Sequence, residues 1–75
     1  MPLIQAKFIE GELSAANKRR VIEKLTDAVL SVTGEKMRPA TWVIIEEVKS
    51  GDWGIAGKAV TLEDARALAA GKAKS

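Results

Sequence analysis

Side chains that commonly do chemistry are scarce in this sequence. It contains no histidine and no cysteine, which excludes a Ser-His-Asp triad, a cysteine nucleophile and the common types of zinc site. The glycines of the segment 51–57 fit neither a P-loop nor a dinucleotide-binding fingerprint, because no strand-to-helix context with the required spacing follows them. Glu46 and Glu47 are neighbours on a predicted strand and point to opposite faces, so they make a poor acid-base pair.

Pro2 is the remaining candidate for catalysis. Removal of the initiator methionine before a small residue such as proline is a common processing step, and it leaves a secondary amine at the chain terminus. An α-amino group has an ordinary pKa of about 7.7 to 8.0, and burial in apolar surroundings lowers it by disfavouring the cation. Proline at position 2 is usually incidental when taken alone. We expect Leu3, Ile4 and Trp53 to supply such surroundings, in which the neutral amine is a usable base near pH 7.

The element that must hold Pro2 begins directly after it. Leu3–Ile9 alternates in the manner of a strand. Glu10-Gly11-Glu12 interrupts the pattern at a structural turn, where glycine gives backbone freedom. Ser14 is placed to cap a helix. The strand pattern places Ile4, Ala6 and Phe8 on one face and Leu3, Gln5, Lys7 and Ile9 on the other.

An amphipathic helix is predicted from Ala15 to Val32, ending near Thr33. Gly34 supplies the left-handed residue that terminates helices, and Pro39 prevents any helical continuation. The predicted buried stripe consists of apolar residues at spacings of one, three and four: Val21, Ile22, Leu25, Ala28, Val29 and Val32.

A second strand is predicted over Thr41–Val48, which is rich in β-branched and aromatic residues. Together with the first strand and the helix it makes a βαβ unit, for which we expect parallel strands and a right-handed crossover. Two strands alone make a poor sheet, and a chain of 75 residues without cysteine has only a small core. Both arguments predict association with further copies of the chain.

The remaining chain is predicted to form a loop or short hairpin followed by a short helix. Ser50–Gly57 contains three glycines, which mark turns and close backbone approach. Thr61-Leu62-Glu63-Asp64 resembles a capping box that opens a helix through Ala70, and we expect residues 72–75 to fray. No linker or repeat divides the sequence, so residues 1–75 are predicted to form one domain of the α/β class, called α+β in some schemes.

Composition and charge exclude several classes of protein. The apolar fraction is 47%, and 12 basic residues against 10 acidic ones give a net charge of +2, a weak field for binding nucleic acid. The basic cluster Lys18-Arg19-Arg20 is followed by Glu23 and Asp27, which indicates a solvated helix face. No signal-peptide pattern and no membrane-length segment is present. We therefore expect a cytoplasmic protein that binds neither nucleic acid nor membrane.

The order of these motifs resembles the 4-oxalocrotonate tautomerase family of the tautomerase superfamily. The resemblance covers residues 2–57 and implies the tautomerase (MIF-like) fold, a hexamer formed from three dimers, an amino-terminal proline as general base, and neither cofactor nor metal. The implied activity is that of an isomerase that moves a proton within an enol or unsaturated carbonyl compound. The segments that carry the resemblance are Pro2-Leu3-Ile4-Gln5, Glu10-Gly11, the Ser-capped helix, Val43-Ile44-Ile45-Glu46-Glu47 and Gly51-Asp52-Trp53-Gly54-Ile55-Ala56-Gly57.

Site residues follow from the same resemblance. Pro2 matches the catalytic proline, and Trp53 matches an aromatic residue in the hydrophobic wall of the site. Typical members carry arginines where this chain has Glu12 and Trp42. Those arginines polarise the substrate carbonyl and hold its carboxylate through charge-assisted hydrogen bonds. Because both arginines are replaced, we expect a substrate that is more apolar and aromatic than a dicarboxylate.

Two other cations are candidates for replacing the missing arginines. Arg38 lies just before the second strand and Lys7 lies on the first, so either could reach the pocket of a neighbouring subunit. Each has a simpler interpretation, Arg38 as a solvated charge before a turn and Lys7 as a surface residue of an edge strand. Trp42 is equally interpretable as a packing residue at a subunit contact, and Trp53 as packing or pocket wall.

Three other functions stay open at this stage. A dehalogenase or decarboxylase of the same superfamily would use a cationic proline as an acid, although such reactions typically need arginines near the substrate. A non-catalytic oligomer that binds small molecules on the same scaffold is favoured by the loss of both family arginines. A nucleic-acid-binding dimer using the basic cluster Lys18-Arg19-Arg20 is the weakest alternative.

Overall fold

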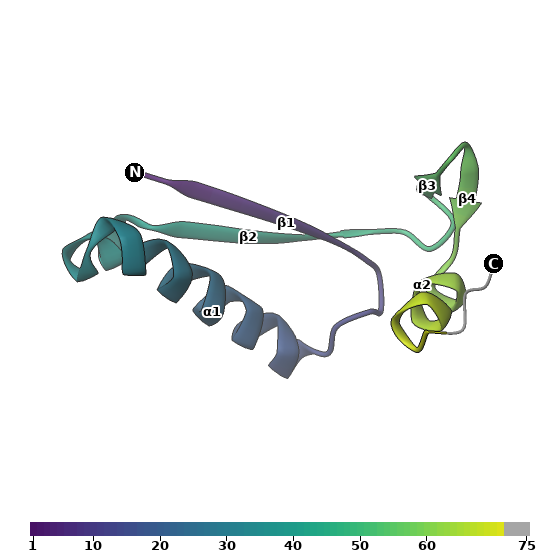
Figure 1. The fold of residues 1–75 in the computed structure, drawn as a ribbon, viewed down its shortest axis with the longest axis horizontal. Coiled ribbons are helices and arrows are strands. Elements are labelled where there is room, and N and C mark those ends of the chain that lie inside the picture. The colour runs from purple at the N-terminus through teal and green to yellow at the C-terminus, as the bar shows by residue number, and fades with distance from the viewer. Residues whose placement is uncertain (72–75) are drawn as a thin grey trace. The chain divides into compact units, whose positions relative to one another are not determined.

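A computed structural model describes residues 1–71 and shows an α+β chain (Figure 1). β1 and β2 pair in one two-stranded sheet, and β3 and β4 pair in a second. Internal packing divides the chain into two compact units: unit 1 comprises Met1–Ala6 and Ser14–Glu46, and unit 2 comprises Lys7–Leu13 and the chain from Glu47 onward. The elements are β1 (Leu3–Ile9), α1 (Ala15–Thr33), the 3-10 helix η1 (Glu35–Ala40), β2 (Trp42–Val48), β3 (Trp53–Ile55), β4 (Lys58–Val60) and α2 (Leu62–Ala69).

β1 and β2 run parallel, which confirms the predicted βαβ unit. The backbone N–H of Trp42 donates to the carbonyl of Pro2 at 3.0 Å, and that of Glu10 donates to Val48 at 2.7 Å, so residue numbers rise in the same direction along both strands. Between these strands the chain passes through α1, as the predicted crossover requires.

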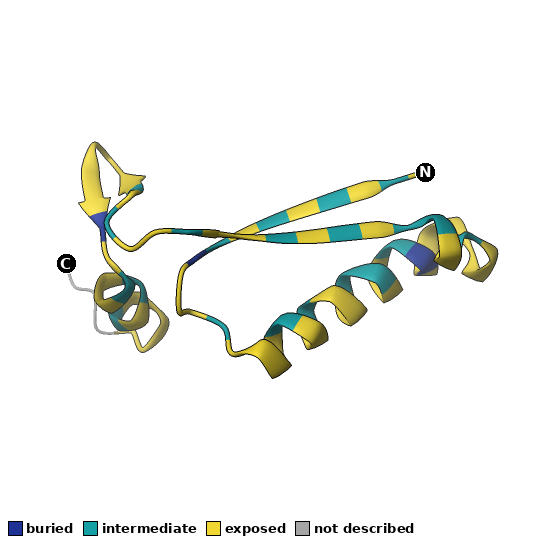
Figure 2. Cartoon of the chain, turned by 180° about the vertical axis from the view of Figure 1, so that it is seen from behind, coloured by how far each residue is buried: buried dark blue, intermediate teal, exposed yellow. Residues whose placement is uncertain are grey.

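Within unit 1, α1 runs along one face of the sheet (Figure 1). The alternating burial of the strands, drawn as bands in Figure 2, agrees with this arrangement. Ile4 and Ala6 are half-buried, as are Val43 and Ile45 of β2. The alternate residues of both strands are exposed, including Leu3 at 51%, Trp42 at 55% and Ile44 at 40%. One face of this sheet therefore carries exposed apolar side chains in the single chain.

Both ends of α1 follow the sequence prediction. Ser14 Oγ accepts a hydrogen bond from the Asn17 N–H at 3.1 Å, which satisfies one of the free amides of the first turn. After Thr33 the chain turns at Gly34, whose φ is 105° and whose N–H donates to the carbonyl of Leu30 at 2.8 Å. Helix propensity and capping thus fix this element locally.

The buried stripe of α1 is narrower than predicted, since Ile22, at 37% exposed, and Ala28 are both exposed. It also differs at the last turn of the helix. Val21, Leu25 and Val29 are half-buried as predicted, whereas Val32 is 86% exposed. Leu30, which the predicted stripe omits, is 5% exposed. Leu30 stands four residues beyond Thr26 on the same helix row, and η1 packs back against α1 at this end.

The expectation that Pro39 prevents any helical continuation is wrong for the segment after Gly34. Pro39 lies inside η1, where the Met37 N–H donates to the carbonyl of Gly34 at 3.1 Å. The fixed φ of proline, about −65°, is also typical of a 3-10 helix, so the ring fits into η1. The only local cost is the backbone N–H donor that proline lacks. The Thr41 hydroxyl donates to the Met37 carbonyl at 2.8 Å and leads the chain into β2.

Unit 2 contains the hairpin that the glycine-rich segment predicted. β3 and β4 pair antiparallel with Trp53 opposite Val60 and Ile55 opposite Lys58. The two-residue turn between them has positive φ at both positions, 54° at Ala56 and 82° at Gly57. Positive φ at both positions is characteristic of a type I′ turn, whose twist matches that of the two flanking strands. Val60 is buried at 8% and, together with Ile9 at 3%, forms the centre of this unit.

α2 begins with the predicted capping box. The Asp64 N–H donates to Thr61 Oγ1 at 3.2 Å, and the Thr61 N–H donates to Asp64 Oδ2 at 3.0 Å. The helix spans Leu62–Ala69. The predicted fraying of residues 72–75 lies outside the described residues. Within residues 1–71, none of the helices meets the length and hydropathy of a membrane span.

Candidate active site and an apolar cavity

Pro2 and Trp42, two of the predicted site residues, are neighbours at one end of the sheet in unit 1. The hydrogen bond from the Trp42 N–H to the Pro2 carbonyl fixes the backbone of the proline. Pro2 is half-buried, whereas the preceding Met1 is 82% exposed. While Met1 is attached, the nitrogen of Pro2 is an amide without basicity. After its removal the same nitrogen is a secondary amine at the start of β1.

Arg38, a predicted substitute cation, is engaged by carboxylates of its own unit. Its Nε lies 2.6 Å from Glu35 Oε1, and its Nη2 lies 3.0 Å from Asp27 Oδ1. The hydrogen bonds that Arg38 donates to the carboxylates of Glu35 and, second, Asp27 raise the pKa of the guanidinium further above its usual range. With its side chain 49% exposed, Arg38 would have to exchange these partners in order to hold a substrate.

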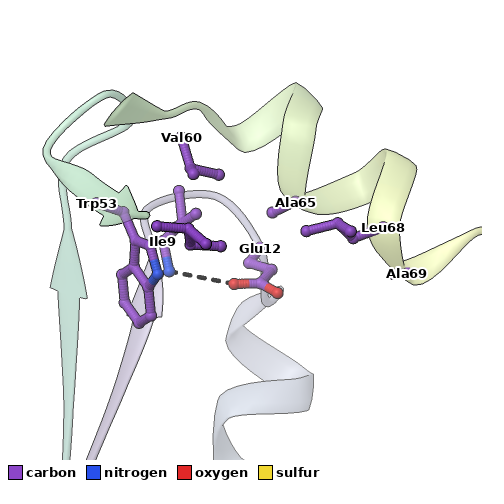
Figure 3. Close-up of a pocket in the computed structure, with 8 residues that line it drawn as sticks. Ile9, Glu12, Trp53, Val60, Ala65, Leu68 and Ala69 are labelled. Carbon is purple, nitrogen blue, oxygen red and sulfur yellow. Dashed lines mark hydrogen bonds between the residues drawn. The ribbon is translucent and has the colours of Figure 1, made fainter. Parts of the chain in front are cut away.

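The other predicted site residues belong to unit 2. Lys7 is exposed on β1, and Trp53 is half-buried at the start of β3. Trp53 lines a cavity of about 390 Å³, within the size range of small-molecule sites (Figure 3). The lining residues come from the end of β1 and its following turn, from the hairpin and from α2: Ile9, Glu12, Trp53, Ile55, Val60, Ala65, Leu68 and Ala69.

Glu12 is the one charged residue of this lining. Its Oε1 accepts a hydrogen bond from the Ile9 N–H at 3.1 Å, drawn as a dashed line in Figure 3. Its own N–H donates to the carbonyl of Ile9 at 3.0 Å. These two bonds hold the exposed Glu12 against the end of β1, with its carboxylate in the cavity wall.

The turn at Gly11 also positions α2. A φ of 89° favours glycine at this position, and a Cβ there would lie 2.9 Å from Leu62 Cδ2. The carbonyl of Gly11 accepts a hydrogen bond from Arg66 Nη2 at 3.3 Å. At the start of the helix, the Leu62 N–H donates to Ser50 Oγ at 2.9 Å. Turn and helix therefore fit together through backbone conformation, close contact and hydrogen bonding.

The sequence did not predict this cavity. It singled out Trp53 and noted Glu12 only as a departure from a family pattern. A signal for the rest was present in α2, where Leu62, Ala65 and Leu68 recur at helical spacing and predict an apolar stripe. Among residues 1–71 no cluster of three potential metal ligands occurs, and neither does the cavity lining contain a histidine or cysteine.

Comparison with known proteins places this architecture among isomerases. The family model described as tautomerase enzyme matches residues 2–63. The 2-hydroxymuconate tautomerase of Pseudomonas putida is 44% identical over 57 residues, which cover 76% of this chain and 87% of the relative. A probable tautomerase of Staphylococcus aureus strain Mu50 is 39% identical over 57 residues, covering 76% of this chain and 90% of the relative.

Solved structures agree with the sequence relatives. A structure from work on the 4-oxalocrotonate tautomerase isozymes of Methylibium petroleiphilum has a TM-score of 0.70 and 36% identity, covering 77% of this chain and 90% of that chain. TomN, a 4-oxalocrotonate tautomerase homologue of the tomaymycin biosynthetic pathway, has a TM-score of 0.72 and 29% identity, covering 91% and 95%. The protein is thus an enzyme of the isomerase class. It belongs to the 4-oxalocrotonate tautomerase family of the tautomerase superfamily.

Proposed function

We propose that the enzyme catalyses keto-enol or 1,3-proton transfer, with the amine of Pro2 as general base and then general acid. The observation that carries this proposal is the position of Pro2. It stands half-buried at the start of β1, with its carbonyl fixed by the Trp42 N–H, and the tautomerase match begins at this residue. Rigid placement of the base next to a bound substrate is what general acid-base catalysis requires.

In the proposed mechanism the neutral amine removes a proton from the enol oxygen or from a carbon. The resulting enolate carries negative charge on oxygen, which hydrogen-bond donors of the site stabilise. The ammonium form of Pro2 then returns the proton to the other position. Since the base must be unprotonated, kcat/KM rises with pH through the pKa of the amine and then levels. A dehalogenase or decarboxylase that uses cationic proline as an acid gives the opposite dependence.

We further propose an enol substrate with an apolar body. The name of the Pseudomonas putida relative specifies 2-hydroxymuconate, but this chain has Glu12 and Trp42 where typical family members carry arginines. In this proposal an indole, that of Trp42 or that of Trp53, contacts the apolar part of the substrate. Arg38 or Lys7 supplies a single cation for its polar end.

We also propose that residues 1–75 act as one domain that assembles into a homo-oligomer, with a hexamer formed from three dimers as the favoured form. Support comes from the uncovered sheet face in unit 1, where Leu3, Trp42 and Ile44 are 51%, 55% and 40% exposed. A second copy that covers this face would remove these side chains from water, a favourable step of about 25 cal/mol for each Å² of apolar surface.

Replacing Pro2 tests the proposed base. We expect Pro2→Ala to ketonise phenylenolpyruvate about 10²-fold more slowly than wild type, the low end for loss of a positioned base, because the processed variant keeps a primary amine. Pro39→Ala is the matched control, since Pro39 lies in η1, and its rate should equal that of wild type. Equal rates for Pro2→Ala and wild type would remove Pro2 from the mechanism.

A further inference from the structure

The cavity of unit 2 combines an apolar lining with one carboxylate. Aliphatic side chains from β1, the hairpin and α2 surround it, and Trp53 adds an indole ring (Figure 3). Glu12 contributes the single charge. A site of this composition suits a ligand that has an apolar part and a single polar group. The apolar part would contact the aliphatic lining, and the polar group would contact the carboxylate.

The sign of this charge decides which ligands enter. A ligand carboxylate would face Glu12 with like charge, and part of its hydration shell would be lost to an apolar wall. An organic ammonium group has the opposite preference. It can donate hydrogen bonds to the carboxylate and is attracted to the face of an indole, the strongest of the aromatic partners for a cation.

Glu12 has accepting capacity left for such a ligand. The Ile9 N–H occupies Oε1, and among residues 1–71 no donor is recorded for Oε2. Arg66 binds the residue that precedes Glu12 in the chain. Its Nη2 is bound to the carbonyl of Gly11, and within the described residues it forms no ion pair with Glu12.

α2 contributes one wall of this cavity. The tautomerase match ends at residue 63, whereas Ala65, Leu68 and Ala69 supply the wall on the helix side. In Figure 3 the side chains of Ala65 and Leu68 project from α2 towards Glu12 and Ile9. The wall is set in place by the close fit of Leu62 on Gly11.

We propose that this cavity binds an arylalkylammonium ion, with the ring against the apolar lining and the ammonium group between Glu12 and the indole of Trp53. The inference concerns binding only and does not depend on proton transfer by Pro2. Glu12 and Trp53 are the residues that determine its specificity, and α2 completes the site.

Binding of three matched probes tests the charge preference. Phenethylammonium, 2-phenylethanol and phenylacetate share a phenyl ring and differ in the charge of the polar end. Their affinities for the full chain can be measured by the shift of the Trp53 indole resonance in NMR titrations. We expect phenethylammonium to bind at least about tenfold more tightly than phenylacetate, a difference of ~1.4 kcal/mol, with the alcohol between them.

Two substitutions test the residue assignment. Glu12→Gln keeps an oxygen for the Ile9 N–H and removes the charge, so phenethylammonium should bind roughly threefold to tenfold more weakly, as expected for a partly exposed ion pair with a cation-aromatic contribution. Glu10→Gln removes a charge two residues away, outside the cavity lining, and should bind as wild type does. Circular dichroism checks that both variants keep the fold.

Three results would overturn the inference: no binding of any probe, equal binding of phenylacetate and phenethylammonium, or equal losses in Glu12→Gln and Glu10→Gln. The titration is repeated on Pro2→Ala, where binding should be unchanged. A failure of catalysis by Pro2 is therefore distinguishable from a failure of ammonium binding in this cavity.

Discussion

Trp42 lies on the uncovered face of β2, and its backbone N–H holds the carbonyl of Pro2. At this position the resemblance to typical family members predicts an arginine that binds substrate carboxylate. Glu12 replaces the other such arginine and lies in the wall of the cavity. At the scale of single residues, the chain therefore differs at two positions from what the resemblance implies, and we expect these substitutions to change the substrate.

Restoring one arginine tests this interpretation. We expect Trp42→Arg to raise kcat/KM for a dicarboxylate enol such as 2-hydroxymuconate by about tenfold, because a charge-assisted pair with a carboxylate contributes ~1.5–3 kcal/mol before screening. Val32→Arg adds the same charge at a position on α1 that is 86% exposed and should leave the rate unchanged. Steady-state kinetics on both variants decide the matter, and no gain in Trp42→Arg would count against the interpretation.

Short-range signals specified most elements. Ser14 and the capping box at Thr61 act through bonds to residues three positions away, so the sequence alone placed both helix starts correctly. η1 was missed because its stability depends on packing against α1, which no local pattern reports. The cavity wall was missed for the same reason, since Arg66 and Gly11 are far apart in sequence yet share a hydrogen bond.

The hairpin turn offers a test at the scale of one element. Ala56 has a φ of 54°, a conformation that costs a residue with a Cβ roughly 1–2 kcal/mol and that asparagine tolerates better. Ala56→Asn creates Asn-Gly, the favoured pair for this turn. We expect the free energy of unfolding to rise by about 0.5–1 kcal/mol in urea denaturation.

A matched substitution separates the turn from a general effect of asparagine. Ala28→Asn changes an exposed position within α1, where asparagine is a poorer helix former than alanine by roughly 0.5 kcal/mol. This variant should be less stable than wild type. Loss of stability in Ala56→Asn as well would show that the turn does not have the described backbone.

The hydrophobic core of the chain is small. Among residues 1–71 the buried apolar side chains are Ile9, Leu30 and Val60, too few for the usual stability of a domain. Sequence length and the absence of cysteine already predicted that copies would associate. The structure indicates the surface at which this association is expected, which is the sheet face that α1 leaves uncovered. Which chains meet there could not be derived from one sequence, because the contacts are made between copies.

A charge on this face tests the proposed assembly. Ile44→Lys places an ammonium group where the proposed oligomer is apolar, and an uncompensated buried charge costs about 3–5 kcal/mol. We expect sedimentation velocity to show smaller species than wild type at equal concentration. Val32→Lys, on an exposed position of α1, should sediment as wild type does. If Ile44→Lys keeps the wild-type mass, this face does not form the interface.

In the proposed mechanism one nitrogen atom, that of Pro2, is the base. A chain of 75 residues can be made by chemical synthesis both with Met1 and without it, so that the two products share every other residue. The measurement is the rate of phenylenolpyruvate ketonisation by each product at neutral pH. We expect the chain beginning at Pro2 to be faster by about 10²-fold or more, and equal rates for the two chains would show that this nitrogen is not the base.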